Sequence, residues 1–204
     1  MFARAPLLGG VKQRLARDIG ETAALAFYQQ SLQALLQRLN GGPWKLSVSV
    51  AGDDRHPVFK GLPTSVQADG DLGQRMKHAL QHSGQQRRVI IGSDIPMIER
   101  FHIEEAFAAL QQHDMVFGPA TDGGFWAIGC NEKVFLNDSS YDDFMCGVRW
   151  SSEHALTDTI ATLPLAMQEH VARISTLSDV DDGPSYEAYQ NSRGSRPCNG
   201  SGNT

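Results

Sequence analysis

One short apolar run followed by an acidic turn constrains the fold of this chain more than any other stretch. Residues 89–91, Val-Ile-Ile, favour a strand that is buried on both faces. Gly92 and Ser93 end this strand, and Asp94 follows at its carboxyl end. Ligands bind outside the carboxyl ends of the strands in open α/β sheets. Asp94 could therefore hold a divalent cation against a phosphate, or it could simply cap a turn before the next helix.

Short strands alternate with helices along the chain, which predicts one α/β domain with a mostly parallel sheet. The 204 residues are enough for a single full-sized core, and we place this domain at residues 1–190. From residue 191 to residue 204 almost nothing is apolar, so a disordered tail is expected there. The expected strands are residues 46–50, 65–67, 89–91, 115–118, 125–129 and 172–177, and the clearest expected helices are residues 21–39, 103–113 and 153–163.

The composition excludes several classes of function. The formal net charge of -5 and the lack of a basic run argue against a nucleic-acid partner. The sequence shows no apolar run long enough for a membrane span and no signal peptide, so a cytoplasmic protein without a membrane partner is expected. The three cysteines and seven histidines are scattered without metal-type spacing. A histidine or cysteine metal site and a Ser-His-Asp triad are therefore not predicted.

The first loop combines glycines with cations. Gly9 and Gly10 precede Lys12 and Arg14. Glycines let a backbone approach an anion closely, and the two cations could neutralise that anion. The Gly-Lys-Ser/Thr ending of a Walker loop is absent. The alternative is a surface loop with two solvated charges.

Two further glycine-containing loops allow a structural and a functional interpretation. Gly70 and Gly73 could make room for a nucleotide base or ribose, or Asp71 between them could simply cap the following helix. The turn at residues 121–124, Thr-Asp-Gly-Gly, is a strong hairpin signal, yet Asp122 with Gly123 and Gly124 could also approach a substrate.

The last candidate positions are aromatic or acidic. Trp150 could line a pocket in which the hydroxyls of the serines after it meet an acceptor, or one of these serines could simply cap the following helix. Asp179, Asp181 and Asp182 crowd three acids into four residues, which repel one another unless a cation lies close. A solvated acidic loop is the alternative.

Several of these motifs together resemble one known family. The chain is similar to an uncharacterised bacterial family of glycosyltransferase-A-like proteins, often described as nucleotide-diphospho-sugar transferases. That family is itself similar in fold to phospholactate guanylyltransferase and to sugar-acid cytidylyltransferases. The resemblance covers about residues 2–190, and the motifs that carry it are residues 2–6, 11–16, 70–76, 92–96, 118–126, 148–152 and 179–181.

The resemblance implies a fold and a set of roles. The fold would be a three-layer α/β/α sandwich with a mixed, mainly parallel sheet. Asp94 would be a ligand of Mg²⁺ or Mn²⁺, and Asp181 or Asp179 would supply the second carboxylate. Lys12 and Arg14 would bind phosphates, and the loop at residues 70–73 would lie near the nucleotide.

The chain departs from the family pattern at four places. Arg4 stands where the family has lysine, which keeps the charge but changes its geometry. Gln13 replaces a threonine, and residues 182–185 differ from the usual Thr-Pro-Glu-Asp. Met1 stands directly before Phe2, where family members usually carry several apolar residues, so the first strand is expected to be truncated.

We interpret the whole as a metal-dependent transferase that uses a nucleotide-activated substrate, with glycosyl transfer favoured. Asp122 would bind the acceptor or act as a base, and Gly123, Gly124, Trp126 and Trp150 would help to surround a sugar. The alternatives are a nucleotidylyltransferase that releases pyrophosphate and a nucleotide-binding homologue without turnover. The sequence does not indicate the nucleotide, the acceptor or the oligomeric state.

Overall fold

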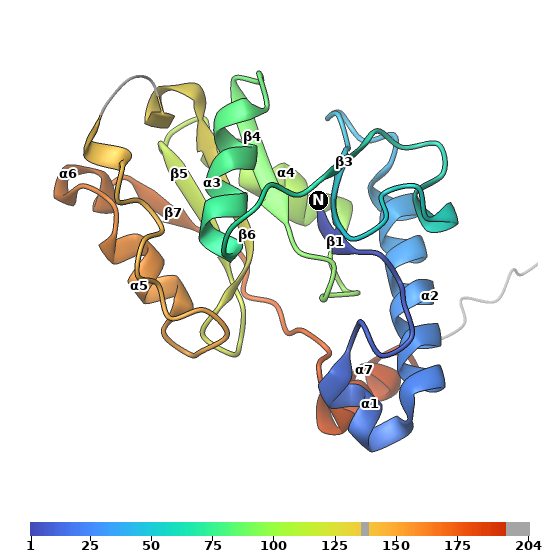
Figure 1. Ribbon diagram of the computed structural model, residues 1–204. Coiled ribbons are helices and arrows are strands. Elements are labelled where there is room, and N and C mark those ends of the chain that lie inside the picture. The colour runs from blue at the N-terminus through green and yellow to red at the C-terminus, as the bar shows by residue number, and fades with distance from the viewer. Residues whose placement is uncertain (136–138, 195–204) are drawn as a thin grey trace, which may run out of the picture.

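The computed structural model describes residues 1–135 and 139–194. Within these residues the strands form two adjacent sheets (Figure 1). The first sheet has the order β1-β2-β3 and is parallel throughout, and the second has the order β4-β6-β5-β7. In the second sheet β6 runs antiparallel to β4 and β5, whereas β5 and β7 are parallel. The strands are β1 (Phe2–Arg4), β2 (Val48–Ala51), β3 (Thr64–Val66), β4 (Arg87–Ile91), β5 (Met115–Pro119), β6 (Phe125–Asn131) and β7 (Val171–Arg173).

The helices follow the apolar periodicity of the sequence. The longest, α2 (Glu21–Leu39), has the predicted bounds, because leucines at steps of three and four give it one buried face. No helix among the described residues is both long and apolar enough to cross a membrane. The other helices are α1 (Gln13–Ile19), α3 (Leu72–His82), α4 (Arg100–Ala109), α5 (Ala155–Ala161), α6 (Leu165–Gln168) and α7 (Gly183–Gly194).

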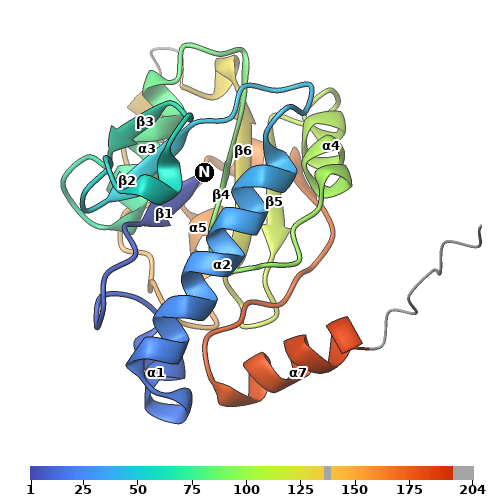
Figure 2. The same ribbon diagram turned by 90° about the vertical axis from the view of Figure 1, so that its right-hand side faces the viewer.

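Helices cover both faces of the sheets, which confirms the predicted α/β/α layers (Figures 1 and 2). On one face α2 and α4 pack on the strands through a core that includes Leu32, Ile103 and Ile91. On the other face α3 and α5 pack through Leu80 and Leu156. The helices α1 and α7 lie together beside the first half of α2, where a third apolar cluster joins them.

Within the described residues no strand pairing joins the two sheets. β1 pairs only with β2, and β4 pairs only with β6. A groove of about 1390 Å³ lies between them and is lined by residues of β2, β4, α3 and α4. Val89 and Ile90 are only half-buried, so the expectation that this strand is buried on both faces was right for Ile91 alone. The physical reason is that β4 has a neighbouring strand on one edge and the groove beside the other.

Several predicted boundaries were wrong, and the helix expected at residues 103–113 is α4, which begins at Arg100 and ends at Ala109. The last strand ends at Arg173, and only an isolated bridge between Ala120 and Leu177 continues its pairing. The helix expected at residues 153–163 is shorter, because turns occupy its first two positions and Thr162 ends it. The tail was expected from residue 191, but residues 191–194 belong to α7, and the rest of the predicted tail lies outside the described residues.

Candidate functional site

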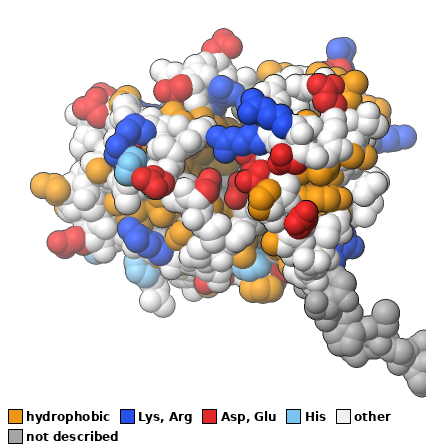
Figure 3. All heavy atoms as spheres, turned by 90° about the horizontal axis from the view of Figure 1, so that it is seen from below, with side chains coloured by type: hydrophobic (Ala, Val, Ile, Leu, Met, Phe, Trp, Pro, Cys, Tyr) orange, Lys and Arg blue, Asp and Glu red, His pale blue; other side chains and the backbone are white. Residues whose placement is uncertain are grey.

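A buried cation meets two carboxylates at the carboxyl ends of the strands. Lys12 lies directly before α1 in the loop that follows β1, Asp94 follows β4, and Asp181 lies just ahead of Asp182 and α7. The Lys12 Nζ atom lies 2.6 Å from Asp94 Oδ1 and 3.7 Å from Asp181 Oδ1. From below, acidic and basic side chains are seen side by side along a hollow in the surface (Figure 3). The structure therefore brings together three predicted site residues that are far apart in the sequence.

The backbone at Lys12 is strained. Its φ of 49° and ψ of 45° are left-handed, which is rare for a residue with a side chain. Lys12 occupies the N-cap position of α1 without a side-chain capping bond, and only 3% of its side chain is exposed. Strained residues of this kind concentrate at functional sites. Arg14 remains at the surface, with 68% of its side chain exposed, and its Nη1 atom lies 3.4 Å from Asp181 Oδ2.

Tyr28 of α2 joins the end of β1 to the loop that carries Ser93 and Asp94. Its hydroxyl accepts from the Arg4 N–H at 3.0 Å and donates to the Arg4 carbonyl at 3.1 Å. The buried Ser93 hydroxyl lies 3.1 Å from the same oxygen and therefore acts as the donor there. Burial raises the pKa of the Tyr28 hydroxyl, so it stays protonated and can keep donating. Sequence reasoning assigned Tyr28 to core packing only, since helical spacing does not show where a hydroxyl points.

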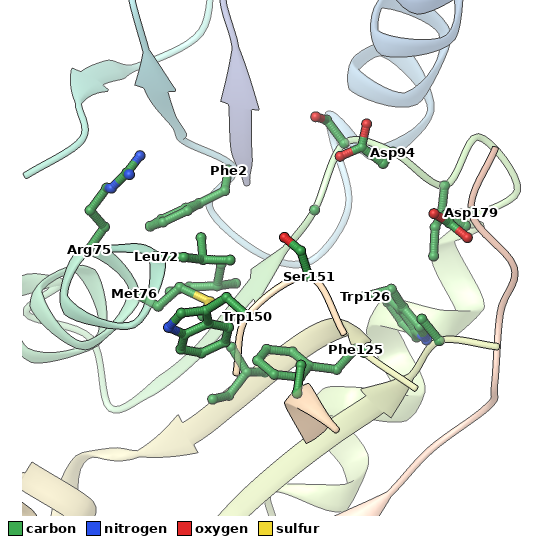
Figure 4. Close-up of a pocket in the computed structure, with 18 of the residues that line it drawn as sticks. Phe2, Leu72, Arg75, Met76, Asp94, Phe125, Trp126, Trp150, Ser151 and Asp179 are labelled. Carbon is green, nitrogen blue, oxygen red and sulfur yellow. The ribbon is translucent and has the colours of Figure 1, made fainter. Parts of the chain in front are cut away.

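A cavity of about 390 Å³ opens beside this cluster (Figure 4). Arg4, Asp94, Asp122 and Asp179 all line it. Asp122 is exposed, and its Oδ1 atom accepts from the Gly124 N–H at 2.9 Å, which shapes the turn after β5. The hairpin prediction for this turn is confirmed, because β5 and β6 pair antiparallel on either side of it. The same turn presents Asp122 and Gly124 to the cavity.

The surroundings of Asp179 in the site raise the pKa of its carboxyl group. Burial raises the pKa of its carboxyl, the nearby Asp122 carboxylate raises it further, and Asp181 adds a smaller rise. The Lys12 ammonium opposes these effects. Asp182 serves the fold instead, since it accepts from the Ser185 N–H at 2.9 Å at the start of α7. In this acidic loop, Asp179 and Asp181 therefore face the charged site, whereas Asp182 caps α7.

For most of the predicted loop glycines, a turn or a close contact with a neighbouring residue explains why glycine is present. Gly9 lies in an exposed turn at φ 71°, and Gly10 closes that turn by donating to the Leu7 carbonyl. A Cβ atom on Gly73 would come within 2.7 Å of the Trp150 ring, so the aromatic ring occupies the room that was predicted for a base. On Gly70 it would collide with Gln74, which completes a capping box with Asp71. Gly123 has φ 87° and lies against the backbone of Glu153.

Of the two predicted tryptophans, Trp150 lines the cavity as expected and Trp126 differs from its prediction. Trp126 is only 3% exposed, packs over Gly118 and donates its Nε1–H to the Ser175 carbonyl at 2.9 Å. It is among the residues that line the cavity, but its burial means that it is not the open aromatic wall that was predicted. Trp150 is half-buried and does line the cavity. It forms an edge-to-face pair with Phe125, which is the ring of β6 that faces the cavity instead.

The described residues contain no group of three or more His, Cys, Asp and Glu side chains that could hold a metal ion by themselves. Asp94 and Asp181 nevertheless approach the same Lys12 ammonium, so both reach one small region. Magnesium is usually held by one or two carboxylates together with substrate phosphates and water. This donor set fits a cation that arrives with a nucleotide, and Asp179 is the third carboxylate in reach of the same charges.

Two positions near the cavity lie outside the set of predicted site residues, although a contact between the Ser151 hydroxyl and an acceptor was one of the alternatives. Arg75 of α3 lines the cavity, and its Nη1–H bonds Gln67 Oε1 at 3.2 Å. Ser151 also lines it and has a left-handed φ of 58° directly after Trp150. The Arg75 charge within the 70–76 motif was a signal that could have been used. The strain at Ser151 has no signature in the sequence.

Comparison with known proteins agrees with this geometry. A family model described as "Uncharacterized protein conserved in bacteria (DUF2064)" matches residues 17–152. The chain belongs to this family. The predicted membership in an uncharacterised bacterial family is thereby confirmed.

Among the solved and curated proteins that resemble this DUF2064 member, two have names that refer to nucleotide transfer. A crystal structure from Desulfovibrio desulfuricans G20, provisionally named a nucleotide-diphospho-sugar transferase, is 28% identical with a TM-score of 0.82, over 98% of this chain and 89% of that one. The 2-phospho-L-lactate guanylyltransferase of Methanocaldococcus vulcanius is 28% identical over 81 residues, which are 40% of this chain and 36% of that relative's length. The Rv0371C protein of Mycobacterium tuberculosis H37Rv, solved in complex with manganese, shares the fold with a TM-score of 0.52 at 12% identity, over 94% of this chain and 96% of that one. The DUF2064 chain thus has the fold of nucleotide transferases.

Proposed function

We propose that this protein is a metal-assisted transferase whose donor is a nucleoside diphosphate sugar. The observation that carries the proposal is the Lys12 ammonium between Asp94 and Asp181, where open α/β sheets bind ligands. A diphosphate at this position would meet Lys12 and Arg14, and a divalent cation would be held by the two carboxylates. The name of the Desulfovibrio relative supports the choice of donor.

In the proposed reaction an acceptor hydroxyl oxygen forms a bond to the anomeric carbon of the sugar. The bond between that carbon and the diphosphate oxygen breaks, and the nucleoside diphosphate leaves with the electron pair. The hydroxyl proton passes to a carboxylate, for which Asp122 at the cavity is the candidate. Lys12 and Arg14 stabilise the negative charge that develops on the leaving group. A bound Mg²⁺ or Mn²⁺ would supply further stabilisation of that charge.

Nucleotidyl transfer is the second candidate, and two observations favour it. Arg4, Lys12 and Arg14 put three cations along the first loop and its flanks, as a triphosphate would need. The Methanocaldococcus relative is named a guanylyltransferase. In that reaction an acceptor oxygen would attack the α-phosphorus of a nucleoside triphosphate, and pyrophosphate would leave with the electron pair and the charge.

Calorimetry in the presence of Mn²⁺ decides between these reactions. Nucleoside diphosphate sugars of uridine, guanosine and cytidine are compared with the matching triphosphates. We expect tighter binding of one diphosphate sugar and its slow hydrolysis. Asp122→Asn should reduce that hydrolysis at least tenfold and leave binding unchanged, while Asp143→Asn on an exposed turn should change neither. Preferential triphosphate binding with release of pyrophosphate would establish the second candidate, and binding without any turnover would leave a nucleotide-binding homologue.

A further inference from the structure

Two histidines lie side by side near the end of α3. His78 and His82 are four residues apart, a spacing that places both side chains on one face of the helix. Their rings are stacked, with centroids 4.1 Å apart and planes inclined by 20°. Two histidines at this helical spacing are a recurrent ligand pair for Zn²⁺. The expectation that the histidines lack metal-type spacing was therefore wrong for this pair.

The histidine pair is distinct from the charged cluster. Leu72, the first residue of α3, lines the cavity beside that cluster, whereas neither histidine does. From Leu72 to His82 the helix rises by about 15 Å, so the pair lies at the far end of α3 from the cavity (Figure 1). The site of the proposed transfer reaction therefore does not use these side chains.

The helix holds the pair in place from its other face. Met76 and Leu80 are buried in the core on that face of α3, Leu80 completely. His78 and His82 are exposed and line the groove between the two sheets, so space is open beside them. A cation bound there could keep water molecules as its remaining ligands without any rearrangement of the backbone.

Hydrogen bonding prepares His82 to act as a ligand. Its Nδ1 atom lies 2.9 Å from the carbonyl oxygen of His78. A carbonyl oxygen only accepts hydrogen bonds, so Nδ1 carries the proton, and the lone pair of the neutral ring is then on Nε2. Metal-binding histidines commonly have this arrangement, in which the hydrogen bond of one ring nitrogen orients the other toward the metal.

Distance and charge also suit a cation. Two nitrogens at about 2.1 Å from a tetrahedral Zn²⁺ are roughly 3.4 Å apart, a separation that rings stacked at 4.1 Å reach by small rotations. The helix α3 ends at His82, and the partial negative charge at a helix C-terminus favours cations. Imidazole nitrogens select Zn²⁺, Cu²⁺ and Ni²⁺, whereas Mg²⁺ and Mn²⁺ prefer oxygen ligands.

We propose that His78 and His82 chelate a divalent cation of the Zn²⁺, Cu²⁺ and Ni²⁺ class. Each histidine supplies one ring nitrogen, which is Nε2 in His82, and water supplies the remaining ligands. The cation joins two successive turns at the end of α3. This site is independent of the function proposed above, because it shares no residue with the charged cluster.

Calorimetry with Zn²⁺, on the protein without a polyhistidine tag, tests this site. Excess Mg²⁺ is present throughout, so that the carboxylates of the charged cluster are occupied by a cation that imidazole binds poorly. We expect one Zn²⁺ per chain, and His78→Gln or His82→Gln should weaken its binding at least tenfold, since glutamine keeps the helix propensity but removes the imidazole. His170→Gln is the matched control, because His170 is also exposed but has no histidine four residues away. This control should stay within twofold of the unchanged protein.

Cu²⁺ gives a second measurement, because its electron paramagnetic resonance spectrum reports the nitrogens bound to it. We expect coupling to two imidazole nitrogens in the unchanged protein and to one in His78→Gln. The chelate is refuted by equal Zn²⁺ affinity in His78→Gln and His170→Gln, by a loss in only one of the two α3 variants, or by the absence of Zn²⁺ binding to the unchanged protein. Coupling to a single nitrogen in the unchanged protein would also refute it. The proposed transferase would stand in each of these cases, because nucleotide binding there involves other residues.

Discussion

Replacing Lys12 with methionine tests how the charged cluster works. The Lys12 side chain is 3% exposed, whereas the side chains of Asp94 and Asp181 are 59% and 40% exposed. Removing one partner of a fully buried ion pair costs about 3–5 kcal/mol, because the other charge is left without water. Here both carboxylates keep contact with water. The expected loss in the free energy of unfolding is therefore only about 1 kcal/mol, the upper end for exposed pairs.

The effect of Lys12→Met on ligand affinity should be larger than its effect on stability. It should weaken the binding of a nucleoside diphosphate and strengthen the binding of Mn²⁺ alone. A nucleoside diphosphate would lose a charge-assisted contact of about 1.5–3 kcal/mol, which corresponds to roughly 10- to 150-fold weaker binding. Mn²⁺ without nucleotide should bind more tightly than before, because the ammonium no longer competes for Asp94 and Asp181. Methionine matches the length of the lysine side chain closely, so the packing of the left-handed residue is retained.

Calorimetry of Mn²⁺ alone and of the diphosphate with Mn²⁺ measures both changes, and urea unfolding measures stability. Lys60→Met, at an exposed position outside the cavity lining, is the matched control. If Lys12→Met weakens Mn²⁺ and the diphosphate alike, or if it lowers stability by 3 kcal/mol or more, the ammonium serves the fold and the reasoning fails.

Three further changes address the rest of the site. Asp94→Asn should abolish Mn²⁺-dependent nucleotide binding while the melting temperature stays within a few degrees, and an unchanged Mn²⁺ affinity would contradict its role as a ligand. Tyr28→Phe should lower the free energy of unfolding by about 1–3 kcal/mol, because the β1 backbone loses its buried partner, whereas Tyr186→Phe on α7 should have little effect in the same urea titration. The Arg149 guanidinium lowers the pKa of Asp158 to about 2 from the usual 3.8, so this pair stabilises the fold above about pH 4 and its contribution is lost as the pH falls toward 2. The melting temperature of the unchanged protein should exceed that of Asp158→Asn above pH 4, and a difference that does not shrink on acidification would refute the assignment.

Local sequence signals were sufficient to predict most helices and strands and the position of one site residue, Asp94. The bounds of α2 follow from leucine spacing, and the antiparallel pairing of β5 and β6 follows from the Asp-Gly turn between them. The position of Asp94 after a strand follows from the apolar run before it. Each of these properties depends on residues that are close together in the chain.

Other properties depend on contacts between distant segments. Phe125 and Trp126 are neighbours on β6 and point to opposite faces, so only one of them can face the cavity fully. Alternation alone does not say which one it is. The packing of Trp126 over Gly118 and its bond to Ser175 decide the matter. In the same way, the sequence contains Lys12 and Asp181 but not the strained turn that places them together.

Because β1 and β4 are not paired, ligand binding at the site should affect local unfolding of β1. Lys12 is attached to one sheet and Asp94 to the other, and no backbone pairing crosses between the two strands. The amide protons of β1 are therefore held by β2 and, at Arg4, by the Tyr28 hydroxyl, with no strand paired on the other side. A ligand that contacts both residues would tie the two sheets to each other and slow the opening that exposes these amides. Hydrogen exchange of residues 2–4 would then report occupancy of the charged cluster without any knowledge of the reaction.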